Sequence, residues 1–143
     1  MSYALPSIPL PPLSRLEAVV HTFYDKIYAH PWIGRFFRHV DQEHQETKLV
    51  RFFQLSWDDQ SFPEMQAQYL RQEHAHMYVT TELFDLRQQL FAEALREHGH
   101  DEREVEIFLE FNDLWRPSVV KESVDQCSSM FTAVVEHPRP DPG

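Results

Sequence analysis

Apolar side chains recur along this chain at the period of an α-helix. In the first long segment they stand three or four positions apart, at Leu16, Val19, Val20, Phe23, Tyr24 and Ile27. This spacing places them on one face of a helix, whereas a half-buried strand alternates apolar and polar residues. No stretch of the sequence shows that alternation. The chain is therefore predicted to be all-α, with helices that bury their apolar faces against one another.

Capping residues and prolines predict where these helices begin and end. Ser14–Glu17 has the spacing of a capping box. Asp41 and Thr81 are residue types that cap helix N-termini, and Gly99 suits the left-handed residue after a helix. We expect roughly six helices with short connections, over residues 14–29, 32–37, 42–57, 63–74, 82–98 and from 101 onward. The last helix is expected to bend at Pro117 and then to continue through the apolar residues up to 134.

The length of 143 residues suits one domain with a single core. Residues 1–12 contain four prolines and are predicted to form an N-terminal extension, followed by a helical domain over 13–136. Residues 137–143 hold three prolines and a glycine, a composition that predicts a disordered tail. The lone Cys127 excludes an internal disulfide and any CxxC motif.

The formal net charge of −10 disfavours nucleic acid and anionic membranes as partners. No run of about 18 apolar residues is present, so we expect no membrane span. The first residues lack the basic and apolar regions of a signal peptide, and a cytoplasmic location is therefore expected. The sequence contains neither GxGxxG nor GxxxxGK[ST], which excludes nucleotide sites of those types.

Aromatic residues are abundant, at 13% of the chain with eleven Phe. Two explanations account for this composition equally well. Large rings can fill the volume of a small core. Rings can also enclose a flat hydrophobic ligand.

Two histidines, His74 and His76, stand near the end of the predicted helix 63–74. On a helix they would lie about 200° apart, so only one could face a pocket while the other faced solvent or the rim. A neutral imidazole can ligate iron when its second ring nitrogen donates a hydrogen bond. A helical histidine is more often an ordinary surface or core residue, so neither histidine indicates a metal site by itself.

Four sequence segments, in this order, resemble truncated haemoglobins of the bacterial type. They are Phe23-Tyr24, Arg35–Phe37, Lys48–Phe53, and His74–Phe84 with the pattern His-x4-Val-Thr-x3-Phe. Within the second segment, Phe36-Phe37 follows Phe23-Tyr24 by thirteen residues. The resemblance implies a globin-like, two-over-two helical sandwich around haem b (iron protoporphyrin IX). The family commonly has a Gly-Gly pair after the distal helix, whereas residues 56–65 contain no glycine.

The resemblance also implies a role for individual residues of the pocket. His74 matches the histidine that ligates iron, and Tyr24 and Gln45 match donors on the distal side. Phe37 matches the ring that stacks on the haem. The other matched or candidate pocket residues are Leu49 and Phe53 on the distal helix, Val79 and Phe84 in the His74 segment, and Lys48 and Arg71 as partners of the propionates.

What the resemblance implies about function is binding of O2, CO or NO at ferrous iron, with a reductase that the sequence does not identify. Oxygen transport, nitric oxide dioxygenation and peroxidase chemistry share the same pocket residues and stay open. An alternative is a six-coordinate haem protein, with His74 and Lys48 or another side chain on the iron, serving electron transfer or sensing. A third is a cofactor-free helical interaction module whose phenylalanines are ordinary core.

Overall fold

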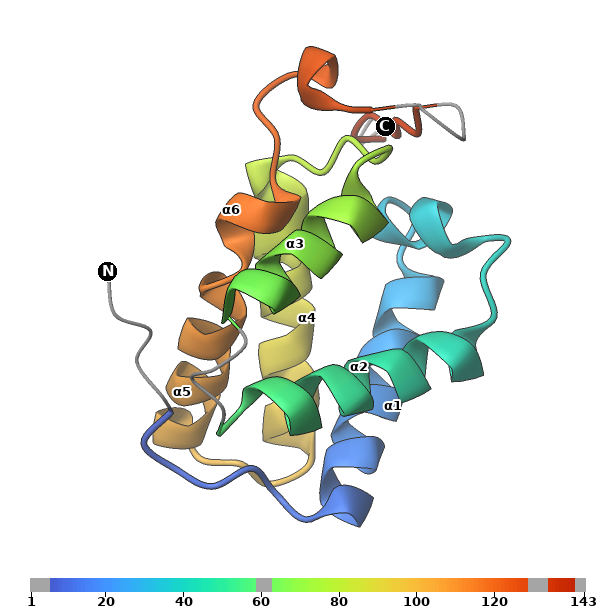
Figure 1. The fold of residues 1–143 in the computed structure, drawn as a ribbon. Coiled ribbons are helices and arrows are strands. Elements are labelled where there is room, and N and C mark those ends of the chain that lie inside the picture. Colours follow the sequence, from blue (N-terminus) through green and yellow to red (C-terminus); the bar gives the residue numbers. More distant parts are fainter. Residues whose placement is uncertain (1–5, 59–62, 129–133, 141–143) are drawn as a thin grey trace.

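The structure is a computed structural model that describes residues 6–58, 63–128 and 134–140 (Figure 1). Its α-helices are α1 (Leu13–Ala29), α2 (Gln42–Ser56), α3 (Pro63–His74), α4 (Thr81–Glu97), α5 (Glu102–Asp113) and α6 (Arg116–Val119). Two 3₁₀ turns, η1 (Ile33–Phe37) and η2 (Val124–Gln126), complete the described elements. No strand occurs in the described ranges, where only an isolated bridge joins Met77 and Val135. The predicted all-α class is confirmed.

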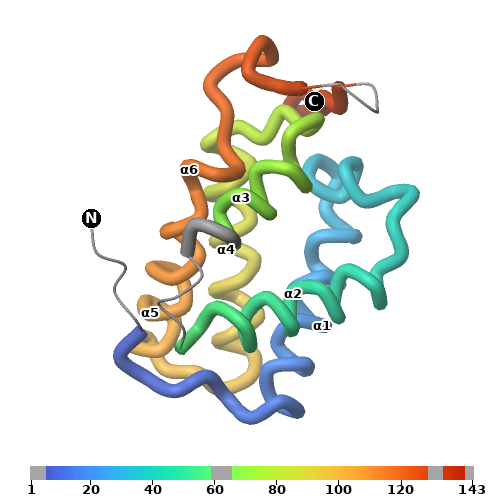
Figure 2. The backbone as a smooth tube through the Cα atoms, viewed as in Figure 1, coloured from blue at the N-terminus to red at the C-terminus, as the bar shows by residue number. Residues whose placement is uncertain are grey.

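The long helices form two pairs that pack on each other. α1 contacts α2, α4 contacts α5, and α1 also contacts α4, which joins the two pairs. Figure 2 shows the pairs as the blue and green tubes of α1 and α2 and the yellow and orange tubes of α4 and α5. The shorter α3 contacts α6. This arrangement is the two-over-two sandwich that the resemblance implies. Among the described helices, none is both long and apolar enough to cross a membrane.

Several helix ends lie where the sequence predicts them. The Asp41 carboxylate accepts the backbone N–H of His44 at 2.9 Å and caps α2. Asp101 and Glu104 form a capping box at the start of α5, each side chain accepting the other's backbone N–H. Gly99 closes α4 with φ 83°, the left-handed conformation that favours glycine.

The N-terminal caps of α1 and α4 differ from the prediction. α1 begins at Leu13, with Pro12 in the cap position and no side-chain cap, so the capping box predicted at Ser14–Glu17 is wrong. The Pro12 carbonyl accepts the N–H of Leu16, which starts the helix one residue early and places Ser14 inside it. At α4 the cap is Thr80, one residue before the predicted Thr81.

The predicted long C-terminal helix is interrupted. α5 ends at Asp113, and α6 is a separate turn with Pro117 in its second position. The chain leaves the helical conformation at Val120, and the backbone N–H of Lys121 donates to the Val79 carbonyl. This tertiary contact replaces the helix that the apolar pattern from residue 119 predicts. The part of that prediction on residues 129–133 lies outside the described residues.

An aromatic cluster fills the core between the two helix pairs. Phe53 of α2 is fully buried, and its ring centroid lies 5.4–6.1 Å from those of Trp57, Phe91, Phe108 and Phe111. The indole N–H of Trp57 donates to the carbonyl of Ile8, so the N-terminal segment covers one end of this cluster. Much of the high phenylalanine content therefore belongs to the core.

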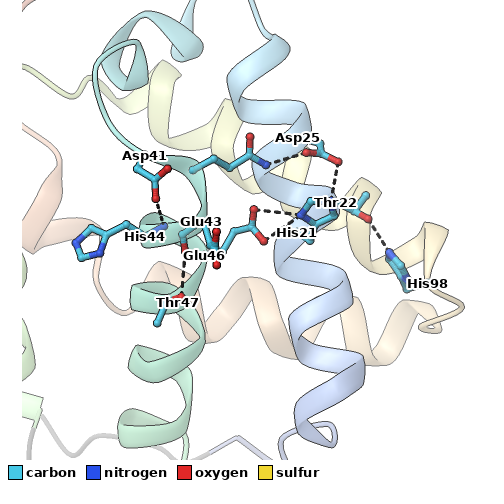
Figure 3. Close-up of polar contacts among 10 residues, drawn as sticks. His21, Thr22, Asp25, Asp41, Glu43, His44, Glu46, Thr47 and His98 are labelled. Carbon is cyan, nitrogen blue, oxygen red and sulfur yellow. Dashed lines mark hydrogen bonds and ion pairs between the residues drawn. The ribbon is translucent and has the colours of Figure 1, made fainter.

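Polar contacts hold α1 in place against α2 and α4 (Figure 3). The His21 ring lies 3.0 Å from the Glu46 carboxylate on α2, and this contact raises the pKa of His21. The Thr22 hydroxyl lies 2.7 Å from Nε2 of His98, the residue that follows α4. These contacts fix the helix that carries Tyr24 relative to the elements around it.

Gly34 is required where η1 crosses the end of α1. A Cβ added there would lie 2.9 Å from the backbone oxygens of both Ile27 and Tyr28, which cannot move away without disturbing α1. We expect Gly34→Ala to lower the free energy of unfolding by about 1–3 kcal/mol, as overpacking does. Chemical denaturation measures this change. Ser14→Ala is the control: because Ser14 is exposed and caps nothing, its effect should stay within about 0.5 kcal/mol. A Gly34→Ala protein as stable as this control would contradict the steric argument.

Candidate functional site

One cavity of about 340 Å³ collects most of the predicted site residues. Its walls come from α1, η1, α2, α3 and α4, with further residues from α5, α6 and the connection between α3 and α4, and most side chains in them are apolar. Eight of the ten predicted residues line it: Tyr24, Phe37, Gln45, Lys48, Leu49, His74, Val79 and Phe84. The volume lies within the range of about 300–1,000 Å³ usual for small-molecule and cofactor pockets.

Two predicted residues do not line the cavity. Phe53 is in the aromatic core on the inner side of α2. Arg71 is exposed on α3. Phe53 is turned toward α4 and α5, because its ring packs against those of Phe91 and Phe108.

His74 lines the cavity, and one of its two ring nitrogens has a hydrogen-bond partner among the described residues. Its Nδ1 lies 2.8 Å from the carbonyl oxygen of Leu70 one turn earlier, and since a carbonyl only accepts, Nδ1 carries the proton. Nε2 is then unprotonated, and no hydrogen bond to it is found among the described residues. Burial lowers the pKa of His74 to about 4, so the ring is neutral near pH 7. A neutral imidazole whose other nitrogen donates to a carbonyl is the form that ligates a metal.

Lys121 holds the turn that carries His74. Its ammonium donates to the carbonyl oxygens of His74, at 2.6 Å, and Met77, at 2.8 Å. A cation at this position satisfies carbonyls that the end of α3 leaves free and complements the helix dipole. Lys121 lies 47 residues after His74, so no local sequence pattern could have indicated the contact.

His76 also lines the cavity, in contrast to the expectation that it would face solvent or the rim. That expectation assumed a helix through both histidines, whereas α3 ends at His74. The chain turns after that residue, and the His76 carbonyl accepts the backbone N–H of Val135 at 2.7 Å. The 200° separation of a helix therefore does not apply to the two rings.

Tyr24 brings a hydroxyl to the cavity from α1. Its side chain is buried, and its ring packs 6.1 Å from that of Phe37, centroid to centroid. Burial raises the pKa of Tyr24 to about 12, so the phenol keeps its proton and stays a donor. No hydrogen-bond partner of this hydroxyl occurs within residues 6–58, 63–128 and 134–140. The group is available to a ligand.

The α2 wall combines polar and apolar side chains. Gln45 and Leu49 are one turn apart and both line the cavity. The Lys48 ammonium lies 3.4 Å from the Glu73 carboxylate of α3, and both residues are partly exposed. This ion pair bridges the two helices at the cavity edge.

Arg87 of α4 is a cavity residue that was not predicted from the sequence. Its guanidinium carbon lies 5.1 Å from the centroid of the Phe23 ring and 6.0 Å from that of Phe91. Burial lowers its pKa. A signal was present in the sequence: Arg87 falls at the spacing of the inward-facing Leu83, Phe84, Leu90 and Phe91, where a charge is unusual.

Residues 134–140, which we call the C-terminal strap, lie against the cavity walls. Val135 pairs through its backbone with the connection between α3 and α4, as the contact with His76 shows. The Trp32 indole N–H donates to the His137 carbonyl at 2.8 Å. The strap thus joins that connection to the region of η1. The composition from 137 predicts disorder, whereas His137, Pro138 and Arg139 make specific contacts in the structure. Residues 141–143 lie outside the described residues.

Comparison with known proteins identifies the fold family. The sequence model of the bacterial-like globin family matches residues 13–118, well over half of the chain and all of the helices from α1 to α5. Searches of curated proteins and of solved structures gave no match. Globins hold a haem cofactor and bind small gases, and the match agrees with the resemblance noted in the sequence. The chain belongs to the bacterial-like globin family.

Proposed function

We propose that the cavity holds one haem b group and that the protein binds O2 or another diatomic ligand there reversibly. The observation that carries this proposal is the His74 ring, with Nδ1 anchored on Leu70 and Nε2 left for a metal. When bound, ferrous haem supplies reversible binding of diatomic gases. The apolar walls suit the macrocycle, and Phe37, which lines the cavity, would pack on its face.

The donors of the opposite wall support a role in retaining a gas ligand. The Tyr24 hydroxyl is protonated and lacks a partner in the described chain, and the Gln45 amide lines the same cavity. A hydrogen bond in an apolar site is stronger than in water, so either group can stabilise a ligand that carries partial negative charge. Hydrogen bonds that retain the bound ligand are useful to an oxygen carrier, to a nitric oxide dioxygenase and to a peroxidase, so these donors do not distinguish the three functions.

The Lys48–Glu73 contact favours an open sixth position over the six-coordinate alternative. An ammonium in an ion pair has no lone pair to give to iron, and this one is drawn toward α3. We therefore propose five-coordinate ferrous haem in the resting protein. The visible spectrum of the reduced, ligand-free protein tests this: sharp low-spin bands would instead support ligation by Lys48 or another side chain.

Reversible oxygenation of the haem-loaded, reduced protein is the test of the proposed function. Adding O2 should give a stable new spectrum, and removing O2 should restore the starting one. Immediate oxidation without an oxygenated spectrum would exclude a carrier role and leave an enzyme or sensor.

Tyr24→Phe is expected to speed O2 release, because it removes a buried donor and nothing else. A hydrogen bond of this kind contributes about 1–3 kcal/mol, which corresponds to an increase of roughly 5- to 150-fold in the rate. Stopped-flow displacement of O2 by CO measures the rate. Tyr28→Phe is the matched control, since the Tyr28 hydroxyl donates to the Val40 carbonyl and is not part of the cavity wall. Equal rates for the Tyr24→Phe and native proteins would remove Tyr24 from the proposal.

A further inference from the structure

Arg87 is a charged side chain in a mostly apolar cavity, with no opposite charge beside it in the described part of the chain. Within the described residues no carboxylate pairs with its guanidinium, and no hydrogen bond to it is found. Its contacts are the faces of the Phe23 and Phe91 rings, at 5.1 and 6.0 Å. Such ring contacts stabilise a cation but use none of its five N–H donors. Several donors are therefore left for another group.

The other polar groups of the cavity wall do not compensate this charge. Lys48 and Glu73 form an ion pair with each other at the edge. Asn112 is neutral, and its amide donates to the side-chain oxygen of Gln88. A buried charge without a partner is costly, and in folded proteins such charges are normally paired or bind a ligand. The chain as a whole is acidic, with a formal charge of −10, which makes a positive interior site more unusual.

Arg87 lines the same cavity as Tyr24 and His74. The guanidinium carbon of Arg87 lies 5.1 Å from the centroid of the Phe23 ring, and that centroid lies 5.0 Å from the centroid of the Tyr24 ring, so Arg87 and Tyr24 are neighbours in the cavity wall. The Tyr24 hydroxyl is a second donor without a partner in the described chain. A guanidinium and a phenol near one another in a low-dielectric space form a site for negative charge.

We propose that Arg87 makes the cavity selective for a small inorganic anion, such as nitrite or azide, which accepts hydrogen bonds from the guanidinium beside Tyr24. This proposal rests on the proposed function, since the anion would occupy the space that a gas ligand uses on the open side of the haem. It adds a ligand class, because an anion carries a full negative charge that the Arg87 guanidinium can neutralise.

Anion titrations of the ferric, haem-loaded protein test the proposal. Sodium azide and sodium fluoride are the anionic probes, and imidazole is the neutral one. Arg87→Met keeps the length of the side chain but removes the charge and all donors. It should weaken azide and fluoride binding by roughly tenfold or more, the effect of losing a charge-assisted hydrogen bond, with imidazole affinity changed less than about twofold. The azide and fluoride affinities of Arg87→Lys should lie between those of the native protein and those of Arg87→Met.

Arg103→Met is the matched control, because Arg103 is exposed on α5 and remote from the cavity wall. It should bind all three probes as the native protein does. Equal anion affinities for Arg87→Met and Arg103→Met would overturn the proposal. Faster haem loss from Arg87→Met with unchanged anion affinity would also overturn it and assign Arg87 to a haem propionate.

A measurement on the haem-free protein separates this proposal from the haem proposal. In ¹⁵N spectra, the side-chain Nε–H signal of Arg87, assigned by its loss in Arg87→Met, should shift saturably with sodium nitrite. A saturable shift in a chain that takes up no haem would uphold the anion site and refute the haem site. No shift, together with no haem uptake, would refute both.

Discussion

His74→Ala is expected to abolish stable haem binding. The substitution removes the cavity-lining ring whose Nε2 is the proposed iron ligand, and no other side chain in the described structure has its anchor on Leu70. Loss of a residue that only orients a metal ligand costs about 10- to 100-fold in metal affinity, so loss of the ligand itself should cost at least about 100-fold. Haem transfer to an excess of apomyoglobin, followed at the Soret band, measures the change.

His76→Ala is the control for the His74 experiment, because His76 also lines the cavity and lies two residues away. Its haem should stay bound much as in the native protein. In His74→Gly, added imidazole should restore the Soret band, since the free base can enter the space left by the ring. If His76→Ala loses haem and His74→Ala keeps it, the iron ligand is His76.

Phe53→Ala is expected to lower the free energy of unfolding by about 3–5 kcal/mol, the usual cost of removing a large ring from a packed core. Phe53 is fully buried, with the rings of Trp57, Phe91, Phe108 and Phe111 around it, and it joins α2 to α4 and α5. Urea unfolding of the haem-free protein measures the change without a contribution from the cofactor.

Leu55→Ala on the same helix is the control, because Leu55 is 51% exposed and should change stability by less than about 0.5 kcal/mol. The comparison also decides between two roles for Phe53. A small stability change combined with faster CO binding would place Phe53 in the wall of the ligand pocket, as the resemblance implies, and would contradict the core position.

The parts of the fold that local chemistry dictates could be predicted from the sequence. Asp41 and the Asp101–Glu104 capping box mark helix starts because their side chains accept N–H groups a few residues away. Ser14–Glu17 has the same spacing, yet Pro12 begins α1 earlier. The break at Val120 could not be predicted, since Lys121 contacts Val79 rather than its own neighbours in the chain.

The candidate site also combines residues that the sequence could predict with residues that only the structure reveals. His74 and Tyr24 could be predicted because their spacing from neighbouring aromatic residues is a family pattern, and both line the cavity. Lys121 and the C-terminal strap act through contacts between distant segments, which no single-sequence pattern encodes. Arg87 was detectable as a charge on an apolar helix face, but only the structure shows that it lines the cavity without a carboxylate partner among the described residues.

The central claim is that the cavity between α1, α2 and α3 binds one haem through His74, and a haem titration of the purified protein tests it most directly. Soret absorbance should rise linearly and break at one haem per chain, and after reduction the band should shift on exposure to CO. A titration without a break, or a bound haem whose spectrum is the same in native and His74→Ala proteins, would contradict the claim.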